Sequence, residues 1–426
     1  MVTVYRIGAS SGEKINMIQK PRGTRDFLPP EMAQRRFIEQ KMRAVAASFG
    51  YGEVVTPMFE EQELFTIKSG EGIIGEMYAF EDKGGRKITL RPEITAAVLR
   101  AYVNEAQMAP KPLRWFYFAE CFRYERPQKG RYRQFWQFGS ELIGADSAAA
   151  DAEVIALSYA LLQCTGVRFV MKIGHLAPMK HLLSGLDAPS QKQVMAALDK
   201  RDMELLATVL ASLDRSDLFE SLKVLITAKT LSEVFAVTGD IPEKARIEET
   251  FRYLEAQNIP FEQNFGIARG LDYYTGMVFE AFADNLGAEN QILGGGVYRL
   301  AHLFGGKDVP SCGFGIGFDR VLVSLGDFVP EKKPVVAVIC TPETRIPAYK
   351  AAECLRSAGI TAVMDLLDRG FGAQLSSALK SGASFAVVIG EKEVAAKTIT
   401  LKDLSTAVQT EMSIDNAIEV IHGSCR

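Results

Sequence analysis

The sequence has few of the residues that bind metals or form disulfide frameworks. Its 426 residues include four histidines and six cysteines, and the cysteines, at positions 121, 164, 312, 340, 354 and 425, form no C-x-x-C pair. The histidines show no H-E-x-x-H spacing or comparable ligand pattern. We therefore expect no metal held in a protein cage, no disulfide framework and a reducing compartment, the cytoplasm.

Long apolar runs and a strong charge imbalance are missing too. No stretch approaches the roughly 18 consecutive apolar residues of a membrane-spanning helix, and the N-terminus lacks the apolar segment of a signal peptide. The 49 Lys and Arg residues nearly balance the 52 Asp and Glu residues, which leaves a net charge of −3. We expect no membrane partner, and any contact with nucleic acid must depend on a local patch.

The common nucleotide-binding motifs are also absent. The one Gly-Lys pair is followed by Asp308, so the Walker pattern fails. The run GFGIG at 313–317 has the wrong spacing for a Rossmann fingerprint and comes late in the chain. If the chain binds phosphates, arginine side chains must hold them.

The order of the expected elements divides the chain into two domains. Helices and meandering antiparallel strands alternate over 17–330, interrupted at 176–258 by a Leu-, Lys- and Glu-rich insertion with helical spacing. After the Pro/Lys linker VPEKKP, strands and helices alternate over 331–426. We predict an α+β fold followed by a separate α/β domain, with residues 1–16 as an N-terminal extension.

A basic and aromatic hairpin is the first candidate site. The chain reads FRYERPQKGRYRQFWQFGSELIG at 122–144, and the pattern predicts two antiparallel strands joined by a cationic loop. Arg123 closes the first strand, where its planar fork could contact a phosphate and a carboxylate together. Phe135 opens the second strand and could stack on a base. A solvated basic hairpin is the alternative interpretation.

Two further segments carry unusual residues. In GFGIGFDR at 313–320, glycine at every second position lets a helix or a ligand approach the strand backbone, and Arg320 follows at a helix start. The segment ARGLDYYTGMVFE at 268–280 carries Arg269, Asp272 and two tyrosines, which are costly to bury without partners. Packing and a structural polar network are the respective alternatives, but beside Arg123 the first segment suggests a second phosphate clamp.

Together these segments resemble the class II aminoacyl-tRNA synthetases and, in detail, the histidyl-tRNA synthetase family. FRYERPQKGRYRQF is similar to the family's motif 2 and GFGIGFDR to its motif 3, while RGLDYYTG and LGGGVYRL resemble its histidine-specific segments. PRGTRDFLPPE and GYGEVVTPMFE resemble its N-terminal opening and motif 1. The resemblance implies a class II antiparallel sheet flanked by helices, with a C-terminal anticodon-binding domain.

The resemblance also implies an activity. The protein would be a ligase that activates histidine with ATP to histidyl-adenylate and transfers histidine to the 3′ end of its tRNA, as a homodimer. Mg²⁺ would accompany ATP. Positioning and fixed charge would supply most of the catalysis, because the reaction needs little proton transfer.

Residue roles follow from the same resemblance. Arg269 would stabilise the charge that develops at the α-phosphate, and Arg123 would hold that phosphate and the histidine carboxylate. ATP would also contact Phe135 beneath its adenine and Arg320 at the far phosphates. The implied histidine-binding residues are Glu93, Thr95 and Gln137 for the α-amino group, and Glu141, Tyr273, Tyr274 and Tyr298 for the imidazole. Hydrogen bonds to both imidazole nitrogens can give roughly 10⁴–10⁵ discrimination without editing.

The sequence departs from the family pattern at three positions. Arg299 stands where an acidic residue is common, Asp319 where Glu is usual, and Ile94 where some members have Gly. These changes leave the local hydrogen bonding around Arg299 open.

Two other functions remain as alternatives. A non-catalytic, histidine-sensing regulatory subunit of ATP phosphoribosyltransferase shares the fold and the pocket, but it lacks the C-terminal domain and tends to lose catalytic arginines that are present here. A generic RNA-binding module would not need Glu93, Gln137, Glu141 and Tyr274 in register.

Overall fold

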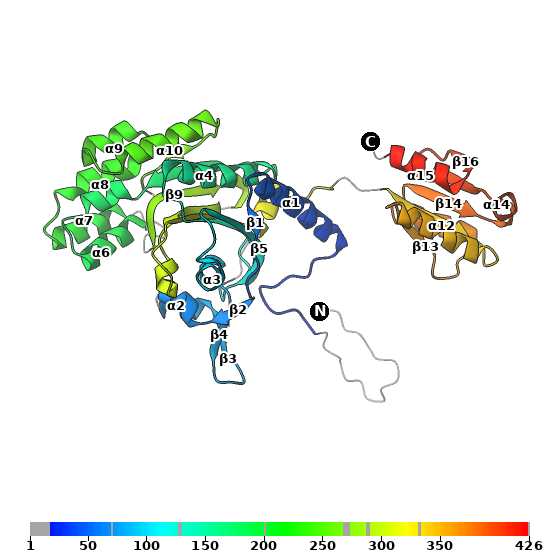
Figure 1. The fold of residues 1–426 in the computed structure, drawn as a ribbon, viewed down its shortest axis with the longest axis horizontal. Helices are drawn as coiled ribbons and strands as arrows, with labels where there is room; N and C mark the ends of the chain where they lie inside the picture. The colour runs from blue at the N-terminus through cyan, green and yellow to red at the C-terminus, as the bar shows by residue number, and fades with distance from the viewer. Residues whose placement is uncertain are drawn as a thin grey trace. The chain divides into compact units, whose positions relative to one another are not determined.

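The computed structural model describes residues 18–69, 71–126, 130–199, 202–266, 273–286, 290–330 and 334–424. The chain divides between Phe328 and Val329 into two compact units, each with its own hydrophobic core (Figure 1). Among the described helices, none is long and apolar enough to cross a membrane.

The first unit is built on an eight-stranded sheet. Its six inner strands pair antiparallel, and a short strand joins each edge in parallel. In sheet order the strands are β1 (Gly52–Glu53), β5 (Leu113–Phe122), β6 (Gln134–Ile143), β11 (Ser311–Gly317), β10 (Gln291–Tyr298), β9 (Tyr274–Phe282), β7 (Val170–His175) and β8 (Glu262–Gln263). The predicted hairpin is confirmed as β5 and β6, and residues 127–129 of its loop lie outside the described part of the chain.

Helices α1 (Pro29–Ser48), α4 (Ala148–Gln163) and α11 (Phe318–Leu325) pack into the core on one face of this sheet (Figure 1). Proline at the first turn starts α1, where a missing N–H costs nothing. The Ser147 hydroxyl accepts a bond of 3.2 Å from the Ala150 backbone N–H and caps α4. Phe138 of β6 and Phe314 of β11 point into this core.

Short elements cover part of the opposite face. They comprise a three-stranded sheet in the order β2 (Phe59–Glu61), β4 (Lys87–Leu90), β3 (Tyr78–Glu81), and the helices α2 (Glu63–Ser69), η1 (Glu71–Glu76), α3 (Thr95–Ala101), η2 (Tyr102–Ala106) and η4 (Ala301–Phe304). The short helix η3 (Asp284–Leu286) instead packs against α11, and its Leu286 joins the core of the first face. Ile94 and Val98 pack on Tyr117 and Cys121, whose side chains leave β5 on this face. The large side chain at position 94 therefore fills a small core under α3.

The predicted helical insertion is confirmed, since the described residues between 176 and 258 contain helices and no strand. The helices are α5 (Ala177–Leu182), α6 (Ala188–Asp199), α7 (Met203–Ser212), α8 (Leu218–Thr227), α9 (Leu231–Thr238) and α10 (Lys244–Ala256). Asp202 and Thr230 cap α7 and α9. Buried leucines such as Leu206 and Leu222 join the core of α4, so the insertion is packed into the first unit.

The second unit is a mixed sheet between two helical layers. The strands lie in the order β13 (Thr361–Met364), β12 (Val335–Cys340), β14 (Phe385–Ile389), β15 (Ile399–Asp403), β16 (Gln409–Met412). The first three are parallel, and β15 and β16 add antiparallel. The helices are α12 (Arg345–Ser357), α13 (Phe371–Lys380), α14 (Glu391–Ala396) and α15 (Ile414–Gly423). The predicted α/β domain is confirmed, with an antiparallel edge that the sequence pattern did not specify.

Candidate active site

A cavity of about 530 Å³ lies on the face of the large sheet opposite α1 and α4. It is lined by residues from α2, the start of α3 and the strands β5, β6, β9, β10 and β11. Nearly all described residues to which the resemblance gave a role line it, namely Glu93, Thr95, Arg123, Phe135, Gln137, Tyr273, Tyr274, Tyr298 and Arg320. Glu141 does not line it, and Arg269 lies outside the described residues.

Glycines leave the cavity floor without side chains. Gly313 and Gly315 of β11 pair with Glu141 and Gly139 of β6, and their neighbours Phe314 and Ile316 point into the opposite core. A methyl group on Gly313 would collide with the Glu141 carboxylate, whereas one on Gly315 would come no closer than 3.8 Å to the Gln137 amide. The alternating glycines therefore expose backbone to the cavity.

The Glu141 carboxylate lies one layer behind the cavity wall. Its side chain is fully buried, and it accepts hydrogen bonds from the hydroxyls of Tyr298 and Tyr117, the latter at 3.3 Å. Burial raises the pKa of Glu141 from 4.5 to about 7, and the hydrogen bonds from Tyr298 and Thr95 offset part of that rise. Both tyrosines line the cavity. Glu141 therefore contacts residues of the cavity wall without lining the cavity itself.

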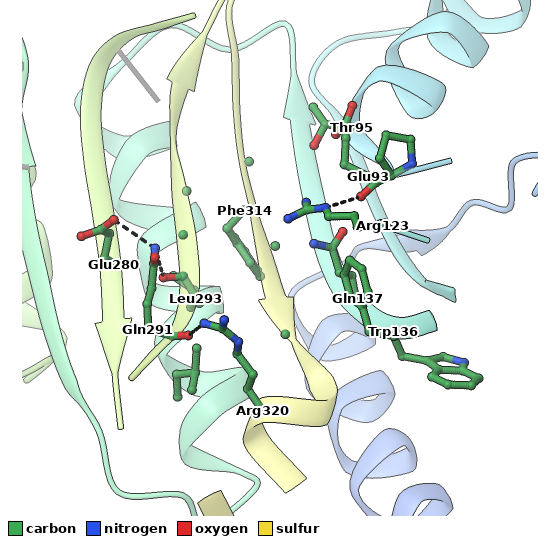
Figure 2. Close-up of a pocket in the computed structure, with 18 of the residues that line it drawn as sticks. Glu93, Thr95, Arg123, Trp136, Gln137, Glu280, Gln291, Leu293, Phe314 and Arg320 are labelled. Carbon is green, nitrogen blue, oxygen red and sulfur yellow. Dashed lines mark hydrogen bonds between the residues drawn. The ribbon is translucent and has the colours of Figure 1, made fainter. Parts of the chain in front are cut away.

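Two arginines lie at the cavity edge, Arg123 beside Glu93 and Gln137 and Arg320 beside Gln291 (Figure 2). Arg123 Nε donates to the Pro92 carbonyl at 2.9 Å, and its guanidinium carbon lies 5.3 Å from the centre of the Phe135 ring. Arg320 Nη1 donates to the Gln291 carbonyl at 2.5 Å and Nε to the Gly130 carbonyl at 3.4 Å. Backbone carbonyls thus orient both guanidinium groups at the cavity edge, which favours a phosphate-bearing ligand.

Asp319 ties the N-terminal segment to the cavity wall. Its Oδ1 lies 2.5 Å from Arg25 Nη2 and 2.7 Å from Arg35 Nη1, and its Oδ2 accepts from the Trp136 backbone N–H at 2.7 Å. The aspartate, although shorter than the glutamate usual at this position, reaches all three partners. Asp319 thereby fixes β6 and the start of α11, and Arg320 is the next residue.

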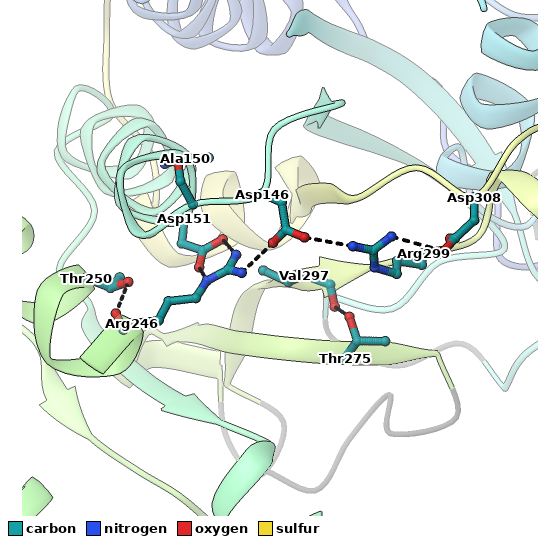
Figure 3. Close-up of polar contacts among 10 residues, drawn as sticks. Asp146, Ala150, Asp151, Arg246, Thr250, Thr275, Val297, Arg299 and Asp308 are labelled. Carbon is teal, nitrogen blue, oxygen red and sulfur yellow. Dashed lines mark hydrogen bonds and ion pairs between the residues drawn. The ribbon is translucent and has the colours of Figure 1, made fainter. Parts of the chain in front are cut away.

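Arg299 belongs to an ion-pair network outside the cavity lining (Figure 3). Its guanidinium binds Asp146 at 2.7 Å and Asp308 at 3.0 Å. Arg246 of α10 also contacts Asp146, and it pairs with Asp151 of α4 at 2.9 and 3.1 Å. Asp146 is thus shared by Arg299 at the end of β10 and by Arg246 of the insertion, which links the insertion to the large sheet.

Lys68 is a site residue that the sequence analysis missed. Its ammonium lies 3.2 Å from Glu93 Oε2 and 4.7 Å from the centre of the Tyr273 ring, and it lines the same cavity. The sequence signal was a single lysine at the end of the short helix ELFTIKS, which no spacing rule links to Glu93.

No metal centre is formed by the side chains that the structure describes. Among them, no group of three or more His, Cys, Asp or Glu residues is close enough to hold an ion. Glu280 contributes a carboxylate to the cavity wall, where its Oε1 accepts from Gln291 Nε2 at 3.0 Å.

The antiparallel sheet with its glycine-floored cavity, edged by arginines from a basic hairpin and from a helix start, is the arrangement that the resemblance to class II aminoacyl-tRNA synthetases implies. The histidyl-tRNA synthetase family profile matches residues 23–321, and an anticodon-binding domain profile matches residues 335–423. The chain is 92% identical over 410 residues to the histidine–tRNA ligase of Methanocorpusculum labreanum, which covers 96% of this chain and 100% of that relative. It is 64% identical over 411 residues to the histidine–tRNA ligase of Methanoculleus marisnigri, with coverage of 96% and 100%.

A solved structure agrees. The apo histidyl-tRNA synthetase of S. aureus superposes with a TM-score of 0.72 at 29% identity, covering 95% of this chain and 100% of that chain. The chain belongs to the histidyl-tRNA synthetase family. The predicted family, fold class and class of enzyme, an aminoacyl-tRNA ligase, are thereby confirmed.

The raised pKa of Glu141 predicts a pH-dependent stability. The folded protein binds this proton more tightly than the unfolded chain, so ionisation destabilises the fold as the pH rises from about 4.5 to about 7. A pKa difference of this size between the folded and unfolded chain changes the free energy of unfolding by roughly 3 kcal/mol. Relative to Glu141→Gln, which cannot ionise, the wild-type melting temperature should fall across this window and level off above it. Scanning calorimetry from pH 4 to 8 measures the difference, and the exposed Glu105→Gln is the control. A constant difference between wild type and Glu141→Gln would contradict the prediction.

Proposed function

We propose that this protein activates histidine with ATP and transfers the histidyl group to the 3′ end of its tRNA. The observation that carries the proposal is that segments far apart in the chain bring arginines, an aromatic ring and a polar pocket to one glycine-floored cavity. Arginines can bind the phosphates of ATP, the aromatic ring can stack on its base, and the polar pocket can bind the amino acid.

In the activation step, a histidine carboxylate oxygen attacks the α-phosphorus of ATP and pyrophosphate leaves. Arg123 holds the α-phosphate and the carboxylate with the guanidinium nitrogens not bonded to Pro92, and Phe135 lies beneath the adenine. Arg320 binds the leaving phosphates, and Arg269 stabilises the charge that develops at phosphorus. Such fixed-charge stabilisation is often the largest catalytic contribution.

The histidine pocket has two ends. Glu93, Thr95 and Gln137 receive the α-amino group, and Tyr273, Tyr274 and Tyr298 surround the imidazole, with Glu141 one layer behind them. Glu141 stands behind this end of the pocket and accepts hydrogen bonds from the Tyr117 and Tyr298 hydroxyls, so it orients these cavity-lining tyrosines for contact with an imidazole nitrogen of the substrate. An analogue without that nitrogen leaves a buried polar group unpaired.

Mg²⁺ bound to ATP would supply positive charge at the leaving pyrophosphate, and Glu280 is the cavity carboxylate that would face it. The cavity fits this arrangement, since Glu280 offers one carboxylate beside Arg320 and Gln291, and Mg²⁺ commonly keeps phosphate and water ligands. In the second step, a ribose hydroxyl of the tRNA terminus attacks the histidyl carbonyl carbon, and AMP leaves. We place the reaction in the cytoplasm, because every cysteine in the described part of the chain is a free thiol; recovery in the membrane fraction of a lysate would count against this.

ATP–pyrophosphate exchange with each of the twenty amino acids, without tRNA, tests the activation step. We expect exchange with histidine alone. Arg269→Ala should lower the exchange rate by roughly 10²–10³, the usual loss when one fixed donor to transition-state charge is removed, while calorimetry shows histidine binding within a few-fold of wild type. Histidine binding without exchange in the wild type would favour the regulatory-subunit alternative. Near-normal exchange in Arg269→Ala would refute the role of Arg269.

The second unit supplies a surface for the anticodon. Leu366 is 79% exposed and Leu367 74% exposed, with Phe371 close behind in sequence. An ion pair of 2.6 Å between Arg345 and Asp368 joins this segment to the start of α12. Exposed apolar side chains beside arginines suit unpaired bases, which stack on such groups.

Removing this surface should weaken tRNA binding alone. We expect Phe371→Ala combined with Leu367→Ser to raise the KM for tRNA about tenfold or more, the cost of losing base stacking, with ATP–pyrophosphate exchange unchanged. Val420→Ser, at a 48% exposed position on α15, is the matched control. An unchanged KM in aminoacylation assays would exclude this surface.

A second copy of the chain is the protein partner that we infer. Val55 is 81% exposed and Phe59 57% exposed near the small sheet, and Phe80 of β3 is 49% exposed. Exposed apolar residues on neighbouring elements of one small sheet are a common feature of interfaces. Light scattering after size exclusion should give twice the mass of the chain. Phe59→Asp should shift the protein toward the monomer, whereas Val224→Asp on α8 should not; a monomeric wild type would refute the inference.

A further inference from the structure

A buried lysine stands in the amino-acid end of the cavity. Lys68 has a side chain that is 7% exposed, and its ammonium lies 3.2 Å from Glu93 Oε2. The same ammonium lies 4.7 Å from the centre of the Tyr273 ring, a distance at which a cation is attracted to the ring face. One side chain thus contacts a residue from each end of the proposed histidine pocket.

Glu93 is held at both oxygens. Its Oε1 accepts a bond of 3.1 Å from the Ala96 backbone N–H at the start of α3, and its Oε2 faces Lys68. A carboxylate has about four lone-pair positions, so these two contacts leave room for a substrate ammonium group. The pair fixes the direction from which that group must approach.

The charges around Lys68 explain why a cation is tolerated there. Burial lowers the pKa of Lys68, but Glu93, with Tyr273 and Glu141, outweighs burial and raises it above its usual value. Conversely, Lys68 lowers the pKa of Glu141 while Glu93 raises it. Two carboxyls in one enclosed pocket repel each other unless a cation lies between them.

We propose that Lys68 is a positioning residue for amino-acid recognition, which holds the Glu93 carboxylate in place for the α-ammonium group of the substrate and steadies the Tyr273 ring. This rests on the proposed function, in which Glu93 receives that group. In this role Lys68 acts through Glu93 and does not touch the substrate. Its removal should therefore weaken the binding of ligands that carry an α-ammonium group and leave the binding of other ligands nearly unchanged.

Three ligands test this with the full-length protein. L-Histidine carries all groups, histidinol keeps the α-ammonium but lacks the carboxylate, and imidazole-4-propionate keeps the carboxylate but lacks the α-ammonium. For Lys68→Met, which preserves length and removes charge, we expect the Kd of histidine and of histidinol to rise tenfold or more. The Kd of imidazole-4-propionate should stay within about twofold.

Kinetics and companion variants give further readouts. In ATP–pyrophosphate exchange, Lys68→Met should raise the KM for histidine more than it lowers kcat, with the KM for ATP unchanged. Lys68→Arg should restore part of the affinity, since it keeps a cation of similar reach. Adding Lys68→Met to Glu93→Gln should cost little more than Glu93→Gln alone, because the two residues act as one unit.

The exposed Lys83→Met, in the β3–β4 turn, is the matched control and should behave as wild type. Equal weakening of all three ligands by Lys68→Met, or no weakening, would overturn the proposal and leave Lys68 a structural residue. If Lys68→Met does not fold, Lys68→Gln, which also removes the charge, carries the same comparison, and Lys68→Arg remains the variant that keeps the charge. Failure of the wild type itself to bind histidinol or to activate histidine would instead refute the proposed function.

Discussion

Strands β6 and β11 carry bulky apolar side chains on one face and glycines with polar groups on the other. Phe138 and Phe314 are buried against the helices on the first face, and each such side chain contributes about 1.5–3 kcal/mol when fully buried. On the second face, Gly315 leaves open space beside Gln137, and Gly313 makes room for the Glu141 carboxylate. The packed face lets the sheet stay rigid while the other face remains hollow, and the whole cavity depends on that division.

Charges in and around the cavity are stabilised by fixed partners. Asp319 has two arginines and a backbone N–H, and Arg123 and Arg320 are each anchored on backbone carbonyls. Groups held this way do not need to reorganise when charge develops in a reaction. The Arg299–Asp146–Arg246 chain gives the insertion a similar fixed connection to the sheet (Figure 3).

Much of the architecture was open to prediction because it depends on local pattern. Alternating aromatic residues indicated β5 and β6, helical spacing indicated the insertion, and the strand–helix alternation after the linker indicated the second unit. The position of Glu141 behind the wall was not predictable, because its burial depends on Tyr117 and Tyr298 from two other strands. The pairing of Lys68 with Glu93 was equally hidden, because α2 and the start of α3 meet only in the folded chain.

The sequence by itself indicated the fold class, because periodicity is a local property, and the resemblance of its motifs to a known family indicated the family. The tertiary structure decided which residues of those motifs face the cavity, which stand behind it, and which charges pair. Asp146 and Arg299 are 153 residues apart in the chain and 2.7 Å apart in space. Such a contact depends on strand order and on which face each side chain leaves, and both are settled only when the sheet closes around its core.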